Sequence, residues 1–546
     1  MPADGDPRNR EQLLLGDIAQ AMRSGNIARA AELADVALAK GVNHSLPYQA
    51  RAVRLDLLGR SDEALANFER ARALDPGDPM VVNGVALCLG RMGRFPESMA
   101  AFDAALRLDP DFATTHFHRG MVLEMHGDFG AACDAYRRSA ALAPGYAAAW
   151  AGLATAAHSG QAWKEAGTAA ARALALEPRQ PRLALPLAFA KIQEGAFDAA
   201  EKLIRDTLAQ PASLPRHLQG TALGLLADAL DGQGRFGEAF ACYTAQNRER
   251  RASYVARPGA PDMAALVRGL TEFFERTYPS QWSAMAVETY GAHTACRHVF
   301  LLGFPRSGTT LLEQILAAHP TVVTLEESNV LDSIAEEFLC DPAGLDRLAA
   351  LCGDELLCVR ERYWQNVRNH GVEARGRVLI DKLPLNTIKL PLIAKLFPQA
   401  RILFCVRDPR DVVFSCFRRA LPVNASTVEL LTPDGAARFY GRVMTLGDIC
   451  RRKLPLAFHV QRLEDLVRDF EGETRRLCAF LGIEWADGVR DFARLAQGRD
   501  IRSISASQVR RGLNSDGLGE WKRYAHELAP ILALLRRWVD LFGYES

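Results

Sequence analysis

One spacing constrains the fold of the first half of this chain more than any other feature. Prolines recur every 34 residues, at Pro76, Pro110, Pro144 and Pro178, and glycines recur at the same period, at Gly59, Gly93, Gly127 and, after an interruption at Gln161, Gly195. A glycine permits a tight turn between two helices. A proline ends a helix because it lacks an N–H donor and crowds the preceding turn. The spacing therefore predicts a series of antiparallel helix pairs.

The residues between each glycine and the following proline support the same interpretation. Most intervals carry a small residue followed by a bulky one, as in Ala64/Phe68, Ser98/Phe102 and Ala132/Tyr136, whereas one has Ala166/Ala170. Small residues let paired helices approach closely, and the bulky ones fill the groove between repeats. The pattern resembles that of tetratricopeptide repeats over residues 11–250, which implies an all-α solenoid. Such solenoids usually bind peptides or protein partners, and a dimerisation or stabilising module is the alternative.

The length of the chain requires at least one further domain. Its 546 residues exceed the ~250–300 residues at which a single core stops growing. Residues 251–296 begin with a stretch rich in proline and glycine and predict a linker with a bridging helix over Met263–Arg276. From there, residues 297–546 alternate short β-rich runs with helical patterns. This alternation predicts a three-layer α/β domain with a parallel sheet.

Charge and composition narrow the function and the location. Lys+Arg 66 against Asp+Glu 65 gives a net charge of +1, which argues against a general nucleic-acid binder. The N-terminus lacks the apolar core of a secretory signal, and no run approaches the ~18 apolar residues of a membrane span. The cysteines form no C-x-x-C pair. These features predict a cytoplasmic protein with free thiols and no structural metal site.

The most informative motif reads G-F-P-R-S-G-T-T and runs from Gly303 to Thr310. An apolar run precedes it, and a helical pattern follows it as far as Pro320. A strand, a glycine loop and a helix N-terminus together predict an anion site. The nucleoside triphosphate loop, G-x-x-x-x-G-K-[ST], has a lysine where this chain has Thr309. Arg306 supplies a cation inside the loop instead, which disfavours a triphosphate with magnesium.

A second candidate anion motif lies about 100 residues further along the chain. Residues 401–406 predict a strand, Arg407 follows it, and Asp408-Pro409 predicts the start of a helix. Ser415 lies about two turns along that helix, on the same face as Asp408. Arg407 and Ser415 can therefore converge on one phosphate.

Together the two motifs resemble those of sulfotransferases, particularly the tyrosylprotein branch, which has P-R-S-G-T-T-L and R-D-x-R-x-x-x-x-S. The resemblance covers residues 297–545 and implies a P-loop-like fold and the donor 3′-phosphoadenosine 5′-phosphosulfate (PAPS), with no metal. It implies that the 5′-phosphate and sulfuryl end is held by Arg306, Ser307, Gly308, Thr309 and Thr310. It further implies that Arg407 and Ser415 hold the 3′-phosphate.

Candidate catalytic residues lie where strands of the sheet should end. Glu326 and Glu327 follow an apolar pair, and because adjacent carboxylates need not share a side, one of them can face the site as a general base. Lys382 ends a further predicted strand, where a cation can neutralise charge developing on the leaving oxygen. The resemblance implies that Glu327 is the base and that Lys382 and Arg306 assist transfer. A solvated helix start and a surface lysine are the alternatives, and Asp381 stands where the tyrosylprotein branch has asparagine.

A third segment resembles the loop that covers the donor in this family. It reads S-x-x-Q-V from Ser505 and continues through a glycine-rich stretch to Trp521. The resemblance implies that Ser505 contacts the donor. Glu520 stands before the tryptophan, where the family usually has a basic residue.

The sequence leaves three functions open. The first is a sulfotransferase acting on an acceptor hydroxyl, with peptide tyrosine, a carbohydrate or a small alcohol as candidate acceptors and the repeats as a peptide-binding module. The second is a repeat-based interaction scaffold whose transferase domain binds nucleotide but is inactive. The third is a kinase, which the missing loop lysine disfavours. The presence of Arg306, Glu327 and Lys382 favours the first.

Overall fold

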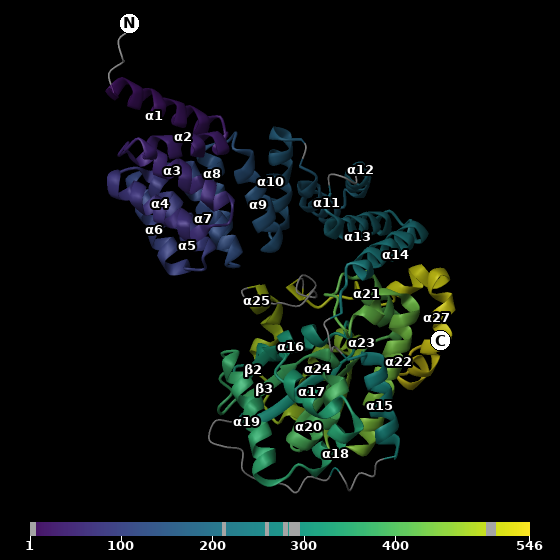
Figure 1. The fold of residues 1–546 in the computed structure, drawn as a ribbon. Helices are drawn as coiled ribbons and strands as arrows, with labels where there is room; N and C mark the ends of the chain where they lie inside the picture. Colours follow the sequence, from purple (N-terminus) through teal and green to yellow (C-terminus); the bar gives the residue numbers. More distant parts are fainter. Residues whose placement is uncertain are drawn as a thin grey trace. The chain divides into compact units, whose positions relative to one another are not determined.

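The computed structural model describes residues 7–178, 180–209, 214–256, 261–276, 282, 295–497, 499, 509–510 and 512–545. Two compact units divide the chain, and both can be followed in Figure 1. We refer to Met1–Leu218 as the repeat unit and to Gln219–Ser546 as the α/β unit. Each unit contains hydrophobic clusters of its own, so each is described by itself.

The repeat unit consists of helices that pack in sequential pairs, with α3 against α4, α5 against α6 and α7 against α8. Its helices are α1 (Pro7–Arg23), α2 (Ile27–Ala39), α3 (Ser45–Leu57), α4 (Ser61–Leu74), α5 (Pro79–Arg91), α6 (Phe95–Leu108), α7 (Ala113–Met125), α8 (Phe129–Leu142), α9 (Ala147–Ser159), α10 (Trp163–Leu176), α11 (Ala184–Gln193) and α12 (Phe197–Leu208). The all-α repeat architecture expected from the 34-residue period is confirmed.

The periodic glycines and prolines form turns and end helices, as the sequence predicted. Gly59 and Gly93 adopt φ values of 73° and 75°, in the left-handed region that favours glycine. Gln161, which interrupts the glycine series, adopts the same conformation with φ 62°. The turn geometry is therefore kept even where a side chain makes it costly. Helix α4 ends at Leu74, just before Pro76.

Aromatic side chains fill the grooves between helices of the repeat unit. Phe102 and Tyr136 are 0% and 1% exposed. A Cβ atom added to Gly120 or Gly152 would lie 2.8 Å or 2.5 Å from the Tyr136 ring. These glycines therefore let two neighbouring helices approach the ring closely, which explains why small and bulky residues alternate along the repeats.

A last helix pair, α13 (Arg216–Gly232) and α14 (Phe236–Ala252), lies almost wholly within the α/β unit. The Asn247 side chain of α14 donates to the carbonyl of Phe417 at 2.7 Å, and Gln246 donates to the carbonyl of Arg418 at 3.5 Å. Both carbonyls lie at the end of a helix that carries site residues. The pair that continues the repeat pattern thus packs as part of the α/β unit.

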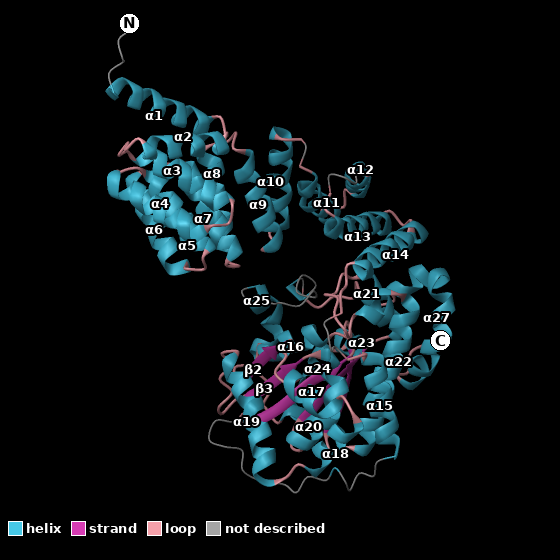
Figure 2. Cartoon of the chain, viewed as in Figure 1, coloured by secondary structure: helices cyan, strands magenta, loops and turns pink. Residues whose placement is uncertain are grey.

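The α/β unit contains a five-stranded parallel sheet of order β2-β3-β1-β4-β5 (Figure 2). Its strands are β1 (Arg297–Gly303), β2 (Val322–Glu326), β3 (Val378–Lys382), β4 (Arg401–Val406) and β5 (Ala457–Arg462). The predicted parallel α/β architecture is confirmed. Because all five strands run in one direction, their carboxyl ends meet along one edge of the sheet, where ligands bind in such folds.

Helices connect these strands and complete the unit. They are α15 (Met263–Arg276), α16 (Thr309–Ala317), α17 (Asp332–Leu339), α18 (Pro342–Ala350), α19 (Gly353–Asn369), α20 (Leu390–Leu396), α21 (Pro409–Arg418), α22 (Pro433–Lys453), α23 (Leu463–Arg468), α24 (Phe470–Leu481), α25 (Phe492–Gln497) and α27 (Ala525–Leu541).

The three inner strands, β1, β3 and β4, are buried on both faces, whereas the edge strand β5 is partly exposed. On one face, Val299 and Leu301 of β1 join a cluster that includes Ile315 of α16 and Leu477 of α24. On the other face, the Phe300 ring lies 6.2 Å from that of Tyr363 on α19. The result is the expected three-layer arrangement, with helices on both sides of the sheet.

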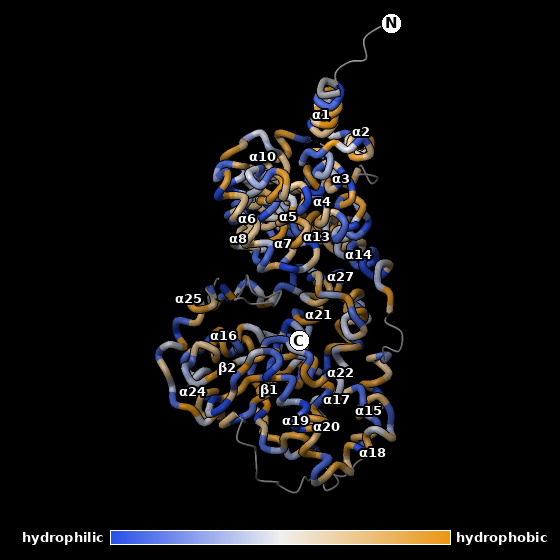
Figure 3. The backbone as a smooth tube through the Cα atoms, turned by 60° about the vertical axis from the view of Figure 1, so that its left-hand side comes forward, coloured by the Kyte–Doolittle hydropathy of each residue, from blue (hydrophilic) through white to orange (hydrophobic). Residues whose placement is uncertain are grey.

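Hydrophobic and hydrophilic residues are interspersed along the helices that Figure 3 labels. Such helices bury one face and leave the other exposed. Within the described residues, no helix is both long enough and apolar enough to cross a membrane. All eleven cysteines are free thiols, as the sequence predicted.

Candidate active site

The predicted phosphate loop lies between β1 and α16, at the carboxyl edge of the sheet. Gly308 caps the helix with φ 94°, and Arg306 in the loop has φ 72°. A Cβ atom on Gly308 would lie 2.9 Å from Leu463, and one on Gly303 would lie 2.5 Å from the carbonyl oxygen of Cys405. The loop is thus held in a conformation that only glycine permits at these two positions. The N-terminal N–H groups of α16 follow it, as an anion site requires.

Arg306 turns from this loop toward the second predicted motif. Its Nε donates to the Oγ of Ser415 at 3.0 Å. Ser415 lies on α21, which begins after Asp408, whose side chain accepts a hydrogen bond from the backbone N–H of Arg410 at 2.9 Å. The N-cap predicted from Asp408-Pro409 is therefore present. The two motifs, distant in sequence, meet side by side.

Arg407, from the second motif, also contacts the phosphate loop. Its Nη1 donates to the carbonyl oxygen of Arg306 at 3.2 Å, and its Nη2 donates to the carbonyl oxygen of Gly517. The side chain is 5% exposed, and its Nε has no hydrogen-bond partner among the described residues. A buried guanidinium N–H without a partner is costly unless a ligand accepts from it. Arg407 therefore fits a phosphate or sulfate oxygen placed beside the loop.

The electrostatics of this region favour an anion. Burial, together with the neighbouring guanidinium groups of Arg419 and Arg407, lowers the pKa of Arg306 to about 9. Crowding by like charges and the scarcity of water both disfavour the charged form of a guanidinium. A bound anion would relieve this repulsion, so the arginine cluster is suited to the phosphate groups of a nucleotide.

Glu327 lies at the end of β2 in a strained backbone conformation. Its φ is 40°, in the left-handed region, and its N–H donates to the carbonyl oxygen of Lys382 at 2.8 Å. Its side chain is 37% exposed, and its Oε1 accepts a hydrogen bond from the Lys382 Nζ at 2.8 Å. Strained residues persist where the surrounding structure fixes them, which is common at functional sites.

Lys382 lies behind Glu327 and is 0% exposed. Its Nζ is 3.2 Å from Oε2 of Glu313 and 3.6 Å from Oε1 of Glu326. Burial opposes the charged amine, but the three carboxylates outweigh burial and raise the pKa of Lys382. The predicted lysine therefore lies beside the predicted base, in contact with carboxylates on three sides.

Glu313 is the functional candidate that the sequence analysis missed. It lies on α16 and is 0% exposed, and its Oε2 is 3.2 Å from the Nζ of Lys382. Burial, which outweighs the attraction of Lys382, raises the pKa of Glu313 from 4.5 to about 8. The sequence did contain one indication of this role, because Glu313 is a lone carboxylate among the apolar residues of a helix that was predicted to pack on the sheet.

Asp381 departs from the tyrosylprotein pattern, and the structure gives the physical reason. Because neighbours in a strand face opposite sides, Asp381 points away from the carboxylates around Lys382. Its Oδ2 accepts a hydrogen bond from Tyr363 at 3.0 Å, and the Tyr363 hydroxyl lies 2.8 Å from Nε2 of His298. Burial raises the pKa of Asp381 to about 7. This residue belongs to a buried polar network beneath the sheet.

One cavity of about 1120 Å³ brings most of these residues together. Its lining includes Arg306, Gly308, Thr309, Thr310, Glu327 and Arg407. Ser307 and Ser415 are buried next to these residues, and Lys382 lies behind Glu327. The loop arginine, the strand-end arginine and the candidate base thus face a common space.

The C-terminal segment closes over α21, but only part of it is described. Ser505 lies outside the described residues. Asp411 of α21 accepts from the N–H groups of Gly519 and Trp521 at 2.6 Å and 2.9 Å, which fixes the tryptophan segment. Glu520 turns inward and accepts from Arg418 at 2.6 Å. Glu520 is therefore half of a buried ion pair, a role that its sequence position did not indicate.

Comparison with known proteins identifies the class to which this fold and site belong. A model described as "Sulfotransferase family" matches residues 298–487, and a tetratricopeptide repeat model matches residues 50–113 and 86–147. The chain belongs to the sulfotransferase family, whose members use PAPS as the sulfuryl donor. The predicted combination of repeats and transferase domain is confirmed.

The curated relatives include protein-tyrosine sulfotransferases. Protein-tyrosine sulfotransferase 1 of Danio rerio is 30% identical over 262 residues, which is 43% of this chain and 71% of the relative. The corresponding protein of Mus musculus is 27% identical over 279 residues, covering 48% and 73%. An uncharacterised protein of Aquifex aeolicus is 25% identical over 255 residues, or 45% of this chain, and the match spans only 33% of that relative.

Proposed function

We propose that this chain transfers a sulfuryl group from PAPS to an acceptor hydroxyl, with Glu327 as the general base. The observation that carries the proposal is the shared cavity, in which Arg306, Arg407 and Glu327 all line one space at the carboxyl edge of the sheet. A donor with phosphates at two ends needs two cationic anchors, and the acceptor needs a base nearby.

The donor would be held by two sets of residues. The backbone N–H groups of Ser307–Thr310 and the Arg306 side chain would bind its 5′-phosphate and sulfuryl end. Arg407 and Ser415 would bind the 3′-phosphate. The unpartnered Nε of Arg407 and the glycine geometry of the loop support this assignment. A contact from Ser505 stays a prediction of the sequence.

The bound donor supplies an electrophilic sulfur and a phosphate leaving group. Glu327 accepts the proton of the acceptor hydroxyl as the acceptor oxygen forms its bond to sulfur. The bond from sulfur to the 5′-phosphate oxygen breaks, and adenosine 3′,5′-bisphosphate leaves with the electron pair. The Lys382 amine donates to the Glu327 carboxylate at 2.8 Å and so keeps it oriented. When it reorients toward the leaving oxygen, the same amine would offset the charge that develops there.

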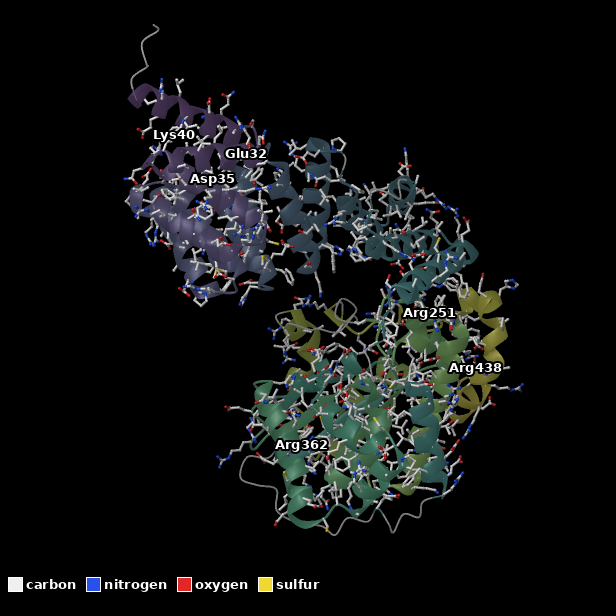
Figure 4. All side chains as sticks on the ribbon, viewed as in Figure 1. Glu32, Asp35, Lys40, Arg251, Arg362 and Arg438 are labelled. Atoms are coloured by element: carbon white, nitrogen blue, oxygen red, sulfur yellow. The ribbon has the colours of Figure 1, made fainter. Side chains whose placement is uncertain are left out.

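Donor binding is tested by calorimetric titration of the full chain. We expect adenosine 3′,5′-bisphosphate to bind at least about tenfold more tightly than ATP with magnesium, because both ends of the ligand meet a cation. Arg306→Ala should weaken that binding by about 10–100-fold, since it removes a charged hydrogen-bond donor. Arg438→Ala is the matched control, because Arg438 projects from α22 (Figure 4) and pairs with Asp434 at 2.9 Å, outside the cavity lining. Equal affinity for the two nucleotides would refute the assignment of the donor.

Transfer is tested with donor that carries radioactive sulfur and a tyrosine-containing peptide, since the relatives are named for protein tyrosine. We expect Glu327→Gln to reduce turnover by about 10²–10⁴-fold while leaving nucleotide affinity nearly unchanged. Glu337→Gln is the control, because that carboxylate pairs with Arg362 at 2.7 Å on the outer side of α17. Undiminished transfer by Glu327→Gln would show that another group is the base.

A further inference from the structure

The cavity has a donor half and an acceptor half, and the strand order separates them. The donor residues follow β1 and β4, whereas Glu327 follows β2, at the far edge of the sheet. Strand β3 lies between β1 and β2. An acceptor that reaches Glu327 must therefore occupy the part of the cavity lined by residues that follow β2 and β3.

The two halves carry opposite charge. The donor half is lined by Arg306 and Arg407. The acceptor half is lined by Glu327 together with Asp332 and Glu336 of α17. Lys389 is the one cation that the described residues contribute to this half, and its Nζ is already paired with Asp332. Lys382 pairs with Glu327 from outside the lining, so Glu336 is the carboxylate of this half for which the described residues provide no cation.

Glu336 is the most informative of these carboxylates. It is exposed, lines the cavity, and has no ion-pair partner among the described residues. Its neighbour on the helix, Glu337, does not line the cavity and pairs with Arg362, which projects from α19 in Figure 4. An unpaired carboxylate that faces a binding cavity selects for cationic groups.

The remainder of the acceptor half is largely apolar. Apolar side chains that follow β2 and β3 line it, including Ala335, Leu339, Leu385 and Ile388. Surfaces of this kind bind aliphatic or aromatic groups, with a few polar groups fixing the orientation. The acceptor half therefore combines an apolar wall with a free carboxylate.

We infer that the acceptor is a basic phenol or a tyrosine in a peptide segment with basic and aliphatic neighbours, and that acidic acceptors are rejected. This inference rests on the proposed function, because it assigns the substrate class of the same site. Glu336 would bind the positive group of the acceptor, and the apolar wall would hold its body while the hydroxyl reaches Glu327.

The test compares two phenols that differ only in the sign of one charge. Tyramine carries an amine, and desaminotyrosine carries a carboxylate at the corresponding position. Both are titrated into the full chain loaded with adenosine 3′,5′-bisphosphate, and both are assayed for transfer from PAPS. We expect tyramine to bind about tenfold more tightly and to give a kcat/KM about tenfold higher, the size of effect that one nearby charge exerts when partly screened. A preference for desaminotyrosine, or equal use of both, would overturn the inference.

Two variants of Glu336 test whether this residue causes the preference for tyramine. Glu336→Gln should remove most of the preference for tyramine, and Glu336→Lys should reverse it, while Glu337→Gln should leave it unchanged. Affinity for adenosine 3′,5′-bisphosphate should stay the same in all three, which shows that the fold is intact. A preference that persists in Glu336→Lys would mean that Glu336 does not select the acceptor.

The binding and transfer measurements separate this inference from the proposed function. Tyramine that binds in a manner dependent on Glu336 but gives no sulfated product would uphold the acceptor class and refute the proposed reaction. Sulfated desaminotyrosine formed faster than sulfated tyramine would uphold the reaction and refute the acceptor class. Peptides that carry tyrosine between lysines or between glutamates extend the same comparison.

Discussion

The pH dependence of stability gives the sharpest test of the carboxylate cluster. In the folded chain Glu313 has a pKa of about 8, compared with an ordinary value of 4.5, chiefly because it is buried. The folded state therefore holds this proton more tightly than the unfolded state does. Its contribution to stability is fully present below about pH 4.5 and is lost as the pH rises through 8. The difference corresponds to about 5 kcal/mol of unfolding free energy.

Glu313→Gln removes this titration while keeping the shape of the side chain. For the α/β unit, about 330 residues long, 5 kcal/mol corresponds to roughly 7 °C in melting temperature. We therefore expect the variant to gain up to about 7 °C over the natural chain between pH 5 and pH 9. The relevant transition in a scan of the full chain is the one that shifts upward with adenosine 3′,5′-bisphosphate.

Glu337→Gln provides the control, since its exposed carboxylate is not buried beneath a lysine. Its melting temperature should follow that of the natural chain at every pH. A constant difference between Glu313→Gln and the natural chain across this pH range would refute the reasoning. It would mean that Lys382 keeps Glu313 ionised throughout and that burial does not decide its protonation.

Three further substitutions test other parts of the structure. Gly308→Ala should weaken binding of adenosine 3′,5′-bisphosphate at least about tenfold, because its φ of 94° is strained for alanine and the new Cβ meets Leu463; unchanged affinity in a calorimetric titration would contradict this. Glu520→Lys should destabilise the α/β unit by about 3–5 kcal/mol, because it places a second cation against buried Arg418; a melting temperature equal to that of Glu520→Gln would argue against a role for the ion pair. Asn247→Ala should cost about 1–3 kcal/mol in urea unfolding, because it leaves a buried carbonyl at the end of α21 without a donor; a loss below about 0.5 kcal/mol would show that water replaces the amide.

Much of the fold could be predicted because its signals are local. The 34-residue spacing of glycine and proline sets the turns and helix ends within single repeats, and even Gln161 keeps the turn conformation. The loop from Gly303 to Thr310 likewise depends on neighbours in the chain. Arg407 and Ser415 were predicted to converge because one strand end and one helix fix both of them, and the structure places Arg306 between them.

The rest depended on contacts between distant segments, which a spacing does not record. Glu313 resembles any polar residue of an amphipathic helix until β3 places the Lys382 amine 3.2 Å from it. Glu520 was only a departure from the family pattern in the sequence, and its partner Arg418 became visible in the structure. The acceptor half could not be predicted either, because α17 and the segment after β3 contribute to it from separate parts of the chain.

The packing of α14 against the end of α21 has a practical consequence for anyone who divides this protein. A fragment that starts near residue 251, where the repeat pattern ends, would lose Gln246 and Asn247, the donors that satisfy the final carbonyls of α21. The same helix carries Ser415, so we expect such a cut to destabilise α21 and with it the predicted phosphate site. A fragment that begins before α13 would keep both donors, so this helical hairpin should travel with the α/β unit.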